Sequence, residues 1–148
     1  MELFGLDPVA DQEILGRILF EPDDWLDGKL TPRAISTQDL SDPDRGWSVQ
    51  RVQCSPHLIR IVAEDRIRKR PQLKVDKVAL FDALAVRRLN RGVTISPHPT
   101  LSNEAHAIVL GPPGEKRSVY KQIKADLIDL LNDINSLDET IRMFKDAA

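Results

Sequence analysis

The chain has 148 residues, of which 41% are hydrophobic and 30% charged, and its formal net charge is −2. This length and balance are typical of one folded domain and exclude a disordered chain. The N-terminus is acidic and no apolar run approaches the roughly 18 residues that span a bilayer, which predicts a cytoplasmic protein without a membrane partner.

The first 46 residues are expected to hold one element of ambiguous type followed by a loop. Asp7 precedes a proline, as at a helix start, and apolar residues follow at helical spacing. The run over 13–20 suits a strand equally well, so both interpretations stay open. Residues 21–46 are rich in acidic side chains, proline and glycine, which predicts a loop with a short helix after Thr31.

Residues 46–54 alternate in polarity, which predicts a strand. This segment places Ser48 near arginines, as some nucleotide-binding folds do at a strand edge. Trp47 is expected to pack into the core, however. That expectation favours a purely structural strand.

Two helices and two strands are predicted in the middle of the chain. One helix covers 57–68 after a Ser-Pro pair. The other covers 77–90, where Asp76 is the expected cap and apolar residues form a stripe on one side. Short strands are expected at 93–96 and 105–111, with a histidine-containing loop between them.

The longest predicted element is an amphipathic helix over 115–148, a segment that lacks proline and glycine. Its apolar residues recur at alternating intervals of three and four, as in a heptad repeat. A second interpretation is a helical hairpin, because Ser136 and Glu139 have the spacing of a capping box. The apolar stripe consists of Tyr120, Ile123, Leu127, Leu130, Ile134, Leu137, Ile141 and Phe144.

These elements predict an α+β fold, with a small sheet of three to five short strands packed with helices. Residues 1–114 would form the body, and the long C-terminal helix over 115–148 would lie across it or extend beyond it within the same domain. The apolar stripe then has two competing uses. It either packs on its own sheet or docks on another protein or a second copy of the chain.

Charge is distributed unevenly along the chain. Residues 1–50 carry 4 basic and 11 acidic side chains, whereas residues 51–91 carry 11 basic and 4 acidic ones. The two stretches either neutralise each other or leave a basic patch for phosphates or nucleic acid. With only Phe81 as an aromatic residue, the basic stretch lacks a base-stacking platform. The patch would include Arg66, Arg68, Lys69, Arg70, Arg87 and Arg88.

Two histidines, His98 and His106, are the candidate catalytic residues. His98 begins a single His-x-Thr unit, in which a histidine handles a proton and a hydroxyl holds a phosphate, but enzymes of that kind need two units. His106 lies in an expected strand, where a buried structural histidine is the ordinary outcome. Cys54 and His57 form a Cys-x-x-His pair with no third orienting residue, so we expect an inert thiol.

Three functions from different classes follow from these patterns. The sequence favours a non-catalytic interaction or accessory subunit that docks through its C-terminal helix. One alternative is a small hydrolase or transferase that acts on a phosphate-containing substrate through His98 and His106. The other is a nucleic-acid-binding accessory protein that uses the basic segment 51–91. No cofactor is expected, and no metal motif is present.

Overall fold

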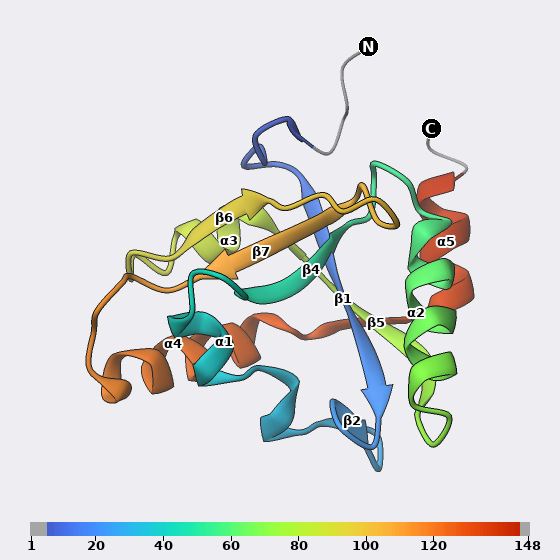
Figure 1. The fold of residues 1–148 in the computed structure, drawn as a ribbon, viewed down its shortest axis with the longest axis horizontal. Coiled ribbons are helices and arrows are strands. Elements are labelled where there is room, and N and C mark those ends of the chain that lie inside the picture. Colours follow the sequence, from blue (N-terminus) through green and yellow to red (C-terminus); the bar gives the residue numbers. More distant parts are fainter. Residues whose placement is uncertain (1–5, 146–148) are drawn as a thin grey trace.

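The structure, a computed structural model, describes residues 6–145 and contains a six-stranded antiparallel sheet with helices on both faces (Figure 1). The strand order is β6-β7-β4-β1-β5-β8. A separate two-stranded hairpin, β2 with β3, lies at one end of β1. The strands are β1 (Ile14–Glu21), β2 (Trp25–Leu26), β3 (Lys29–Leu30), β4 (Trp47–Arg51), β5 (Lys74–Asp82), β6 (Thr94–Pro97), β7 (His106–Leu110) and β8 (Asp133–Ser136).

Two hydrophobic clusters lie on opposite faces of the sheet. The first cluster includes Leu19, Trp47 and Ile123, and it is covered by α1, α3 and α4. The second includes Ile18 and Ile59, and it is covered by α2 and α5. The helices are α1 (Thr37–Ser41), α2 (Leu58–Lys69), α3 (Ala83–Arg87), α4 (Arg117–Leu130) and α5 (Leu137–Lys145), with a 3₁₀ turn, η2, at Pro32–Ala34.

The mixed α+β class is confirmed, but the expected size of the sheet is wrong, because the main sheet alone has six strands. The ambiguous run over 13–20 is β1, the long strand between β4 and β5. Its side chains enter both clusters, with Leu15 and Leu19 in the first and Ile18 in the second. A strand covered on both faces carries apolar side chains on both sides, so β1 lacks the alternation that identifies a half-buried strand.

The predicted helix over 77–90 is wrong for much of its length. Residues 74–82 form β5, and only Ala83–Arg87 form a helix, capped by Asp82 rather than Asp76. The Asp82 carboxylate accepts a hydrogen bond from the backbone N–H of Ala85 at 2.7 Å. Along residues 78–81 the side chains alternate between the two clusters, because β5 lies between β1 and β8 with both faces covered.

The predicted long C-terminal helix is also wrong. The longest helix in the described residues is α4, with 14 residues, and β8 follows it as an edge strand of the main sheet. Polar side chains explain the break, because short amides and carboxylates compete for local hydrogen bonds and disfavour helix. The Asn132 amide donates to the carbonyl of Asp129 at 3.1 Å, and that of Asn135 donates to the Asp133 carboxylate at 3.0 Å.

The helical hairpin is wrong as well, since a strand connects the last two helices. Ser136 nevertheless lies at the start of α5, where its hydroxyl oxygen accepts a hydrogen bond from the backbone N–H of Glu139 at 3.0 Å. The capping pattern therefore marks a real helix start, but of a helix that covers only Leu137–Lys145.

One irregularity of the sheet opens a space beside β1. β1 and β4 are in register only at Leu15 with Arg51 and at Gly16 with Gln50. Beyond these pairs β4 turns away from β1 (Figure 1). In place of the ladder, the Arg17 Nη1 atom donates a hydrogen bond to the carbonyl oxygen of Ser48 at 2.9 Å.

Candidate functional site

A hollow of about 180 Å³ lies where β4 leaves β1, with α2 on its other side. It continues toward the loop before β7 as a space of about 350 Å³ and toward α1 as a space of about 320 Å³. We call this region the β1–β4 pocket. Its central part is lined by Gly16, Arg17, Ile18, Phe20, Ser48, Val49, Gln50, Val62, Arg66, Asn103 and His106.

Ser48 and His106 form a hydrogen-bonded pair in the β1–β4 pocket. The Nε2 atom of His106 lies 3.1 Å from the Ser48 hydroxyl oxygen, and Nδ1 lies 2.8 Å from the backbone carbonyl oxygen of His98. A carbonyl oxygen only accepts, so Nδ1 carries the proton and Nε2 presents a lone pair to the Ser48 hydroxyl. This arrangement makes Nε2 a base directed at a hydroxyl group.

The rings of the two candidate histidines, His98 and His106, lie next to each other. Their ring centroids are 5.1 Å apart in an edge-to-face arrangement. Burial lowers the pKa of His106, and the nearby His98 acts in the same direction, while the hydrogen bond to the His98 backbone opposes them. His106 is therefore neutral at physiological pH, as a general base must be.

The loop that precedes β7 is fixed against β4 by a pair of amide side chains. Gln50 and Asn103 exchange two hydrogen bonds, of 3.1 and 2.6 Å, and both residues are buried. The backbone N–H of His98 donates to the carbonyl of His106 at 2.9 Å, which closes the loop. These contacts give His106 a fixed position beside Ser48.

Two arginines line the same pocket from different elements. Arg17, on β1, lies 3.5 Å from the Asp24 carboxylate, and its Nε atom is buried without a hydrogen-bond partner among the described residues. Arg66, on α2, stacks over Phe20 with its guanidinium carbon 5.5 Å from the ring centroid. Within residues 6–145 the guanidinium group of Arg66 forms no hydrogen bond or ion pair, although its backbone carbonyl accepts a hydrogen bond from the N–H of Arg70 at 2.9 Å. The pocket therefore has cationic groups available for an anion.

A third arginine, Arg45, borders the part of the pocket next to α1. Its Nε atom is 3.5 Å from the Asp39 carboxylate, and the arginine side chain is 63% exposed. Asp24 pairs with Arg17; burial raises the pKa of Asp24, and the adjacent Arg17 lowers it.

Asp65 and Arg68 line the part of the pocket next to the loop before β7, where they pair with each other. Acids thus pair with Arg17, Arg45 and Arg68, whereas the guanidinium group of Arg66 has no acidic partner within residues 6–145.

Most other members of the expected basic patch are paired with acids. Arg68 and Lys69 lie within 3.6 and 3.2 Å of the Asp65 carboxylate, and Arg70 is 2.8 Å from Asp23. Arg87 is 2.7 Å from Asp11, and together with Arg88 it lies at the end of α3, on the opposite sheet face from α2. The structure therefore does not bring the six basic residues together.

The eight residues of the expected docking stripe lie against the chain's own core. Tyr120, Ile123, Leu127 and Leu137 are buried. The remaining four, Leu130, Ile134, Ile141 and Phe144, are partly buried and pack on one of the two clusters. A partner-binding role for the stripe remains a prediction, and four of its members are accessible only if this packing opens.

Cys54 and His57 do not form a reactive pair. Burial raises the pKa of the Cys54 thiol to about 11, with a further contribution from Glu104. The His57 ring lies 3.3 Å from the Ser55 hydroxyl instead. In the part of the chain that the structure describes, no group of three or more histidine, cysteine and acidic side chains is placed to hold a metal ion.

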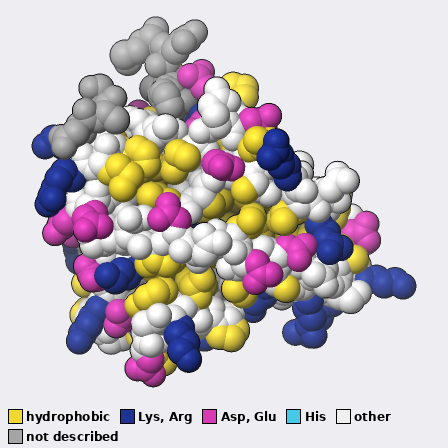
Figure 2. All heavy atoms as spheres, turned by 180° about the vertical axis from the view of Figure 1, so that it is seen from behind, with side chains coloured by type: hydrophobic (Ala, Val, Ile, Leu, Met, Phe, Trp, Pro, Cys, Tyr) yellow, Lys and Arg dark blue, Asp and Glu magenta, His cyan; other side chains and the backbone are white. Residues whose placement is uncertain are grey.

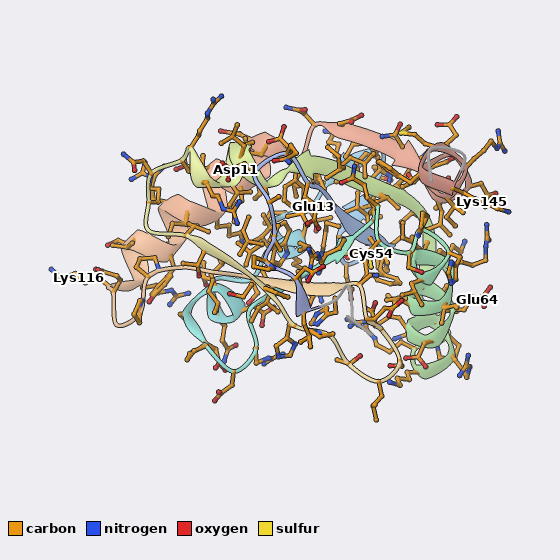
Figure 3. The ribbon with its side chains drawn as sticks, turned by 90° about the horizontal axis from the view of Figure 1, so that it is seen from above. Asp11, Glu13, Cys54, Glu64, Lys116 and Lys145 are labelled. Atoms are coloured by element: carbon orange, nitrogen blue, oxygen red, sulfur yellow. The ribbon has the colours of Figure 1, made fainter. Side chains whose placement is uncertain are left out.

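A buried ion pair that the sequence did not reveal joins the N-terminal segment to β4. Arg51 is 1% exposed, and its Nε and Nη2 atoms donate to the two oxygens of Glu13 at 2.7 and 2.8 Å. Arg51 also donates to the carbonyl of Asp7 at 2.7 Å, and the hydrogen bonds to Glu13 raise the pKa of Arg51. Figure 3 shows Glu13 toward the middle of the molecule, whereas Lys116 and Lys145 lie at opposite ends.

The rest of the surface offers less chemistry than the β1–β4 pocket. A larger hollow of about 650 Å³ lies between α1 and the start of α4, but no histidine or cysteine lines it. Figure 2 shows the reverse face, where acidic and basic side chains are interspersed with hydrophobic patches and no histidine of the described residues is visible. None of the helices in residues 6–145 has the length and hydropathy that crossing a bilayer requires.

Sequence reasoning identified His106 and Arg66 but treated Ser48 as a residue of a structural strand. The strand contributes to the core through Trp47, which is 1% exposed, and it also places the exposed Ser48 in the pocket. Arg17 was missed because only the departure of β4 from β1 brings it into the site. No protein-family model matches this chain, and neither curated proteins nor solved structures provide a match.

Proposed function

We propose that the protein binds a small molecule carrying a phosphate group in the β1–β4 pocket. One observation supports this most directly. Arg66 lines a hollow together with Arg17, Ser48 and His106, yet it forms no ion pair with any residue in 6–145. A guanidinium group presents several N–H donors in a fork that matches phosphate oxygens, and a hydroxyl group adds a further donor.

The size of the pocket favours a small ligand. The central hollow of about 180 Å³ corresponds to roughly six water molecules at about 30 Å³ each. A phosphate group and a few further atoms fill such a space. The adjoining space of about 350 Å³ provides room for the rest of the ligand, and Ile61 and Val62 give it an apolar side.

The other two functions have less support. Nucleic-acid binding needs many unpaired cations along one surface, whereas four of the six candidate residues are paired with acids. Docking through the C-terminal stripe needs a free apolar face, and those side chains pack on the two clusters. The β1–β4 pocket offers exposed groups that need no such rearrangement.

Isothermal titration calorimetry tests the proposal with inorganic phosphate and with phenylphosphonate, an analogue whose carbon–phosphorus bond resists hydrolysis. We expect saturable binding of both at one site per chain, and weaker binding as salt screens the arginines. Benzyl alcohol, which has a ring but no phosphate, is the matched ligand and should not bind detectably. Equal heats for phenylphosphonate and benzyl alcohol would contradict the proposal, as would the absence of binding by either anion.

A further inference from the structure

We propose that Ser48 is a nucleophile activated by His106, and that the β1–β4 pocket hydrolyses a phosphate monoester through a phosphorylated Ser48. This inference rests on the proposed function, because the phosphate that the pocket binds is also the group that reacts. It goes beyond binding, since it assigns a covalent reaction to a named hydroxyl group.

The strongest support is the relay of hydrogen bonds from Ser48 to His106 and on to a backbone carbonyl. The distances are 3.1 Å from the Ser48 hydroxyl to Nε2 and 2.8 Å from Nδ1 to the carbonyl of His98. Nucleophilic serines in enzymes need these parts: a base within hydrogen-bond reach and a third group that orients the base. Here a backbone carbonyl performs the orienting task that a carboxylate performs in many serine enzymes.

The pair lies on rigid elements of the fold. Ser48 belongs to β4 and His106 to β7, and these strands are in register at Ser48 with Ile108 and at Gln50 with His106. Ser48 and His106 are therefore diagonal neighbours on one sheet face, within reach of each other's side chains. A site built on paired strands keeps reacting groups in place better than a site on a free loop.

The two arginines lie where charge changes during phosphoryl transfer. The guanidinium of Arg17 donates to the Ser48 carbonyl oxygen at 2.9 Å, which places it beside the nucleophile. Arg66 reaches the same hollow from α2. In phosphoryl transfer the negative charge is spread over the equatorial oxygens, so catalysis depends mainly on positioning and on cations around the phosphate.

The reaction balances with water as the only co-reactant. The Ser48 oxygen forms a bond to phosphorus while its proton moves to Nε2 of His106, and the bond between phosphorus and the ester oxygen breaks. The leaving oxygen lies opposite Ser48 across phosphorus, so it takes a proton from solvent water and departs as an alcohol, while His106 keeps the serine proton. In the second half a water molecule attacks phosphorus from the side that the alcohol left and gives up a proton to solvent, Nε2 of His106 returns its proton to the Ser48 oxygen, and inorganic phosphate leaves.

Ser48 is exposed, so water has access to the phosphorylated intermediate. His106 is half-buried and neutral near pH 7, because burial lowers its pKa, and it is thus in the form that accepts the serine proton. The exposure of Ser48 therefore suits a nucleophile, and the partial burial of His106 suits a neutral base.

An ethyl fluorophosphonate tests the nucleophile without knowledge of the natural substrate. Attack by Ser48 forms an oxygen–phosphorus bond, fluoride leaves, and His106 takes the serine proton. Peptide mass spectrometry should locate the adduct at Ser48, and Ser48→Ala should abolish it. His106→Asn retains a donor for the His98 carbonyl but lacks the base, and it should slow labelling roughly 100-fold or more.

Ser118→Ala is the matched control, because Ser118 is exposed on α4, away from the pocket, and this variant should label at the wild-type rate. In the wild type the rate should fall as acid protonates His106, and this profile serves as an independent measurement if His106→Asn does not fold. Labelling of Ser48 no faster than that of Ser118 would overturn the inference, and so would a rate that His106→Asn leaves unchanged.

The same samples separate this inference from the proposed function. If calorimetry shows phosphate binding but Ser48 does not react with the fluorophosphonate, the proposed binding function remains supported and the proposed hydrolysis is overturned. Reactive Ser48 that inorganic phosphate does not protect would contradict the shared site. Absence of both binding and labelling would overturn both proposals.

Discussion

The hydroxyl group of Ser48 lies 3.1 Å from the Nε2 atom of His106, although 58 residues separate them in the chain. The pairing of β4 with β7 brings them together, and the departure of β4 from β1 opens the space in which they lie. Arg17 and Arg66 line the same space. The site is thus assembled from three strands and a helix, none of which carries a recognisable motif.

Replacement of Arg66 by glutamine should weaken phosphate binding by roughly tenfold or more, because a charged hydrogen bond contributes about 1.5–3 kcal/mol. Lys69→Gln removes the same charge from the same helix, but Lys69 pairs with Asp65 and does not line the pocket. It should change affinity less than twofold after allowance for screening. Calorimetric titration with phenylphosphonate measures both variants, and equal losses would indicate a general charge effect.

Replacement of Glu13 by glutamine should destabilise the fold by about 3 kcal/mol or more, because it leaves a buried arginine without its carboxylate. Asp11→Asn is the matched control: its ion pair with Arg87 is largely exposed, with Asp11 61% accessible, and such pairs contribute about 0–1 kcal/mol. Urea unfolding followed by circular dichroism gives both values. Similar losses for the two variants would contradict the structural role assigned to the buried pair.

Gly46 immediately precedes β4, the strand that carries Ser48, and it should not tolerate a side chain. Its φ is +67°, and an added Cβ would lie 2.6 Å from Cβ of Ile108. Gly28 also has a positive φ, of +76°, but nothing lies within 4 Å of its added Cβ. Gly28→Ala should therefore cost about 1–2 kcal/mol for the backbone alone, and Gly46→Ala roughly 1–3 kcal/mol more for the steric contact. Thermal unfolding compares them.

His106 should make the protein less stable in acid. Because burial lowers its pKa in the folded state, the unfolded chain takes up a proton first as the pH falls below roughly 6.5, the ordinary value for histidine. The stability associated with neutral His106 is thus present above that pH and declines below it. Urea unfolding at about pH 7.5 and about pH 5.5 should show a smaller loss for His106→Asn than for the wild type.

His57→Asn is the control for this pH dependence, because His57 is exposed and outside the β1–β4 pocket. It should retain the wild-type decline in acid. A decline that His106→Asn leaves unchanged would show that other groups govern acid stability.

The sequence predicted several elements well where local signals were sufficient. Residues 47–51 and the helix after Ser55-Pro56 follow from alternation and from a proline start, and the structure has β4 and α2 there. β5 was misread because Leu80, Phe81 and Leu84 have helical spacing. A central strand is apolar at successive positions when both faces of the sheet are covered. Whether both faces are covered depends on the whole fold and is not visible in the sequence of the strand itself.

The heptad spacing after Glu115 failed for a related reason. Residues 120–130 keep the predicted helical stripe, but the stripe continues at Ile134 as part of a strand that pairs with β5. The spacing of apolar residues alone does not distinguish one unbroken helix from a helix followed by a strand. In both cases the apolar residues can recur at intervals of three and four. The polar residues that follow α4 disfavour a helix, and they indicated that the helix ends there.

The candidate site shows the same limit more sharply. His98 and His106 were named as candidates because they lie eight residues apart in one segment. The contact between His106 and Ser48 depends on strand register, which no short segment of sequence specifies. The position of Arg17 in the pocket depends in turn on where β4 leaves β1.

Titration of inorganic phosphate into isotopically labelled protein, followed by nitrogen–proton correlation spectra, tests the central claim most directly. The account predicts saturable shift changes concentrated at the amides of Arg17, Ser48, Arg66 and His106, with little change at Arg117 beside the larger hollow between α1 and α4. Changes confined to Arg117 and its neighbours, or no saturable change at all, would contradict it.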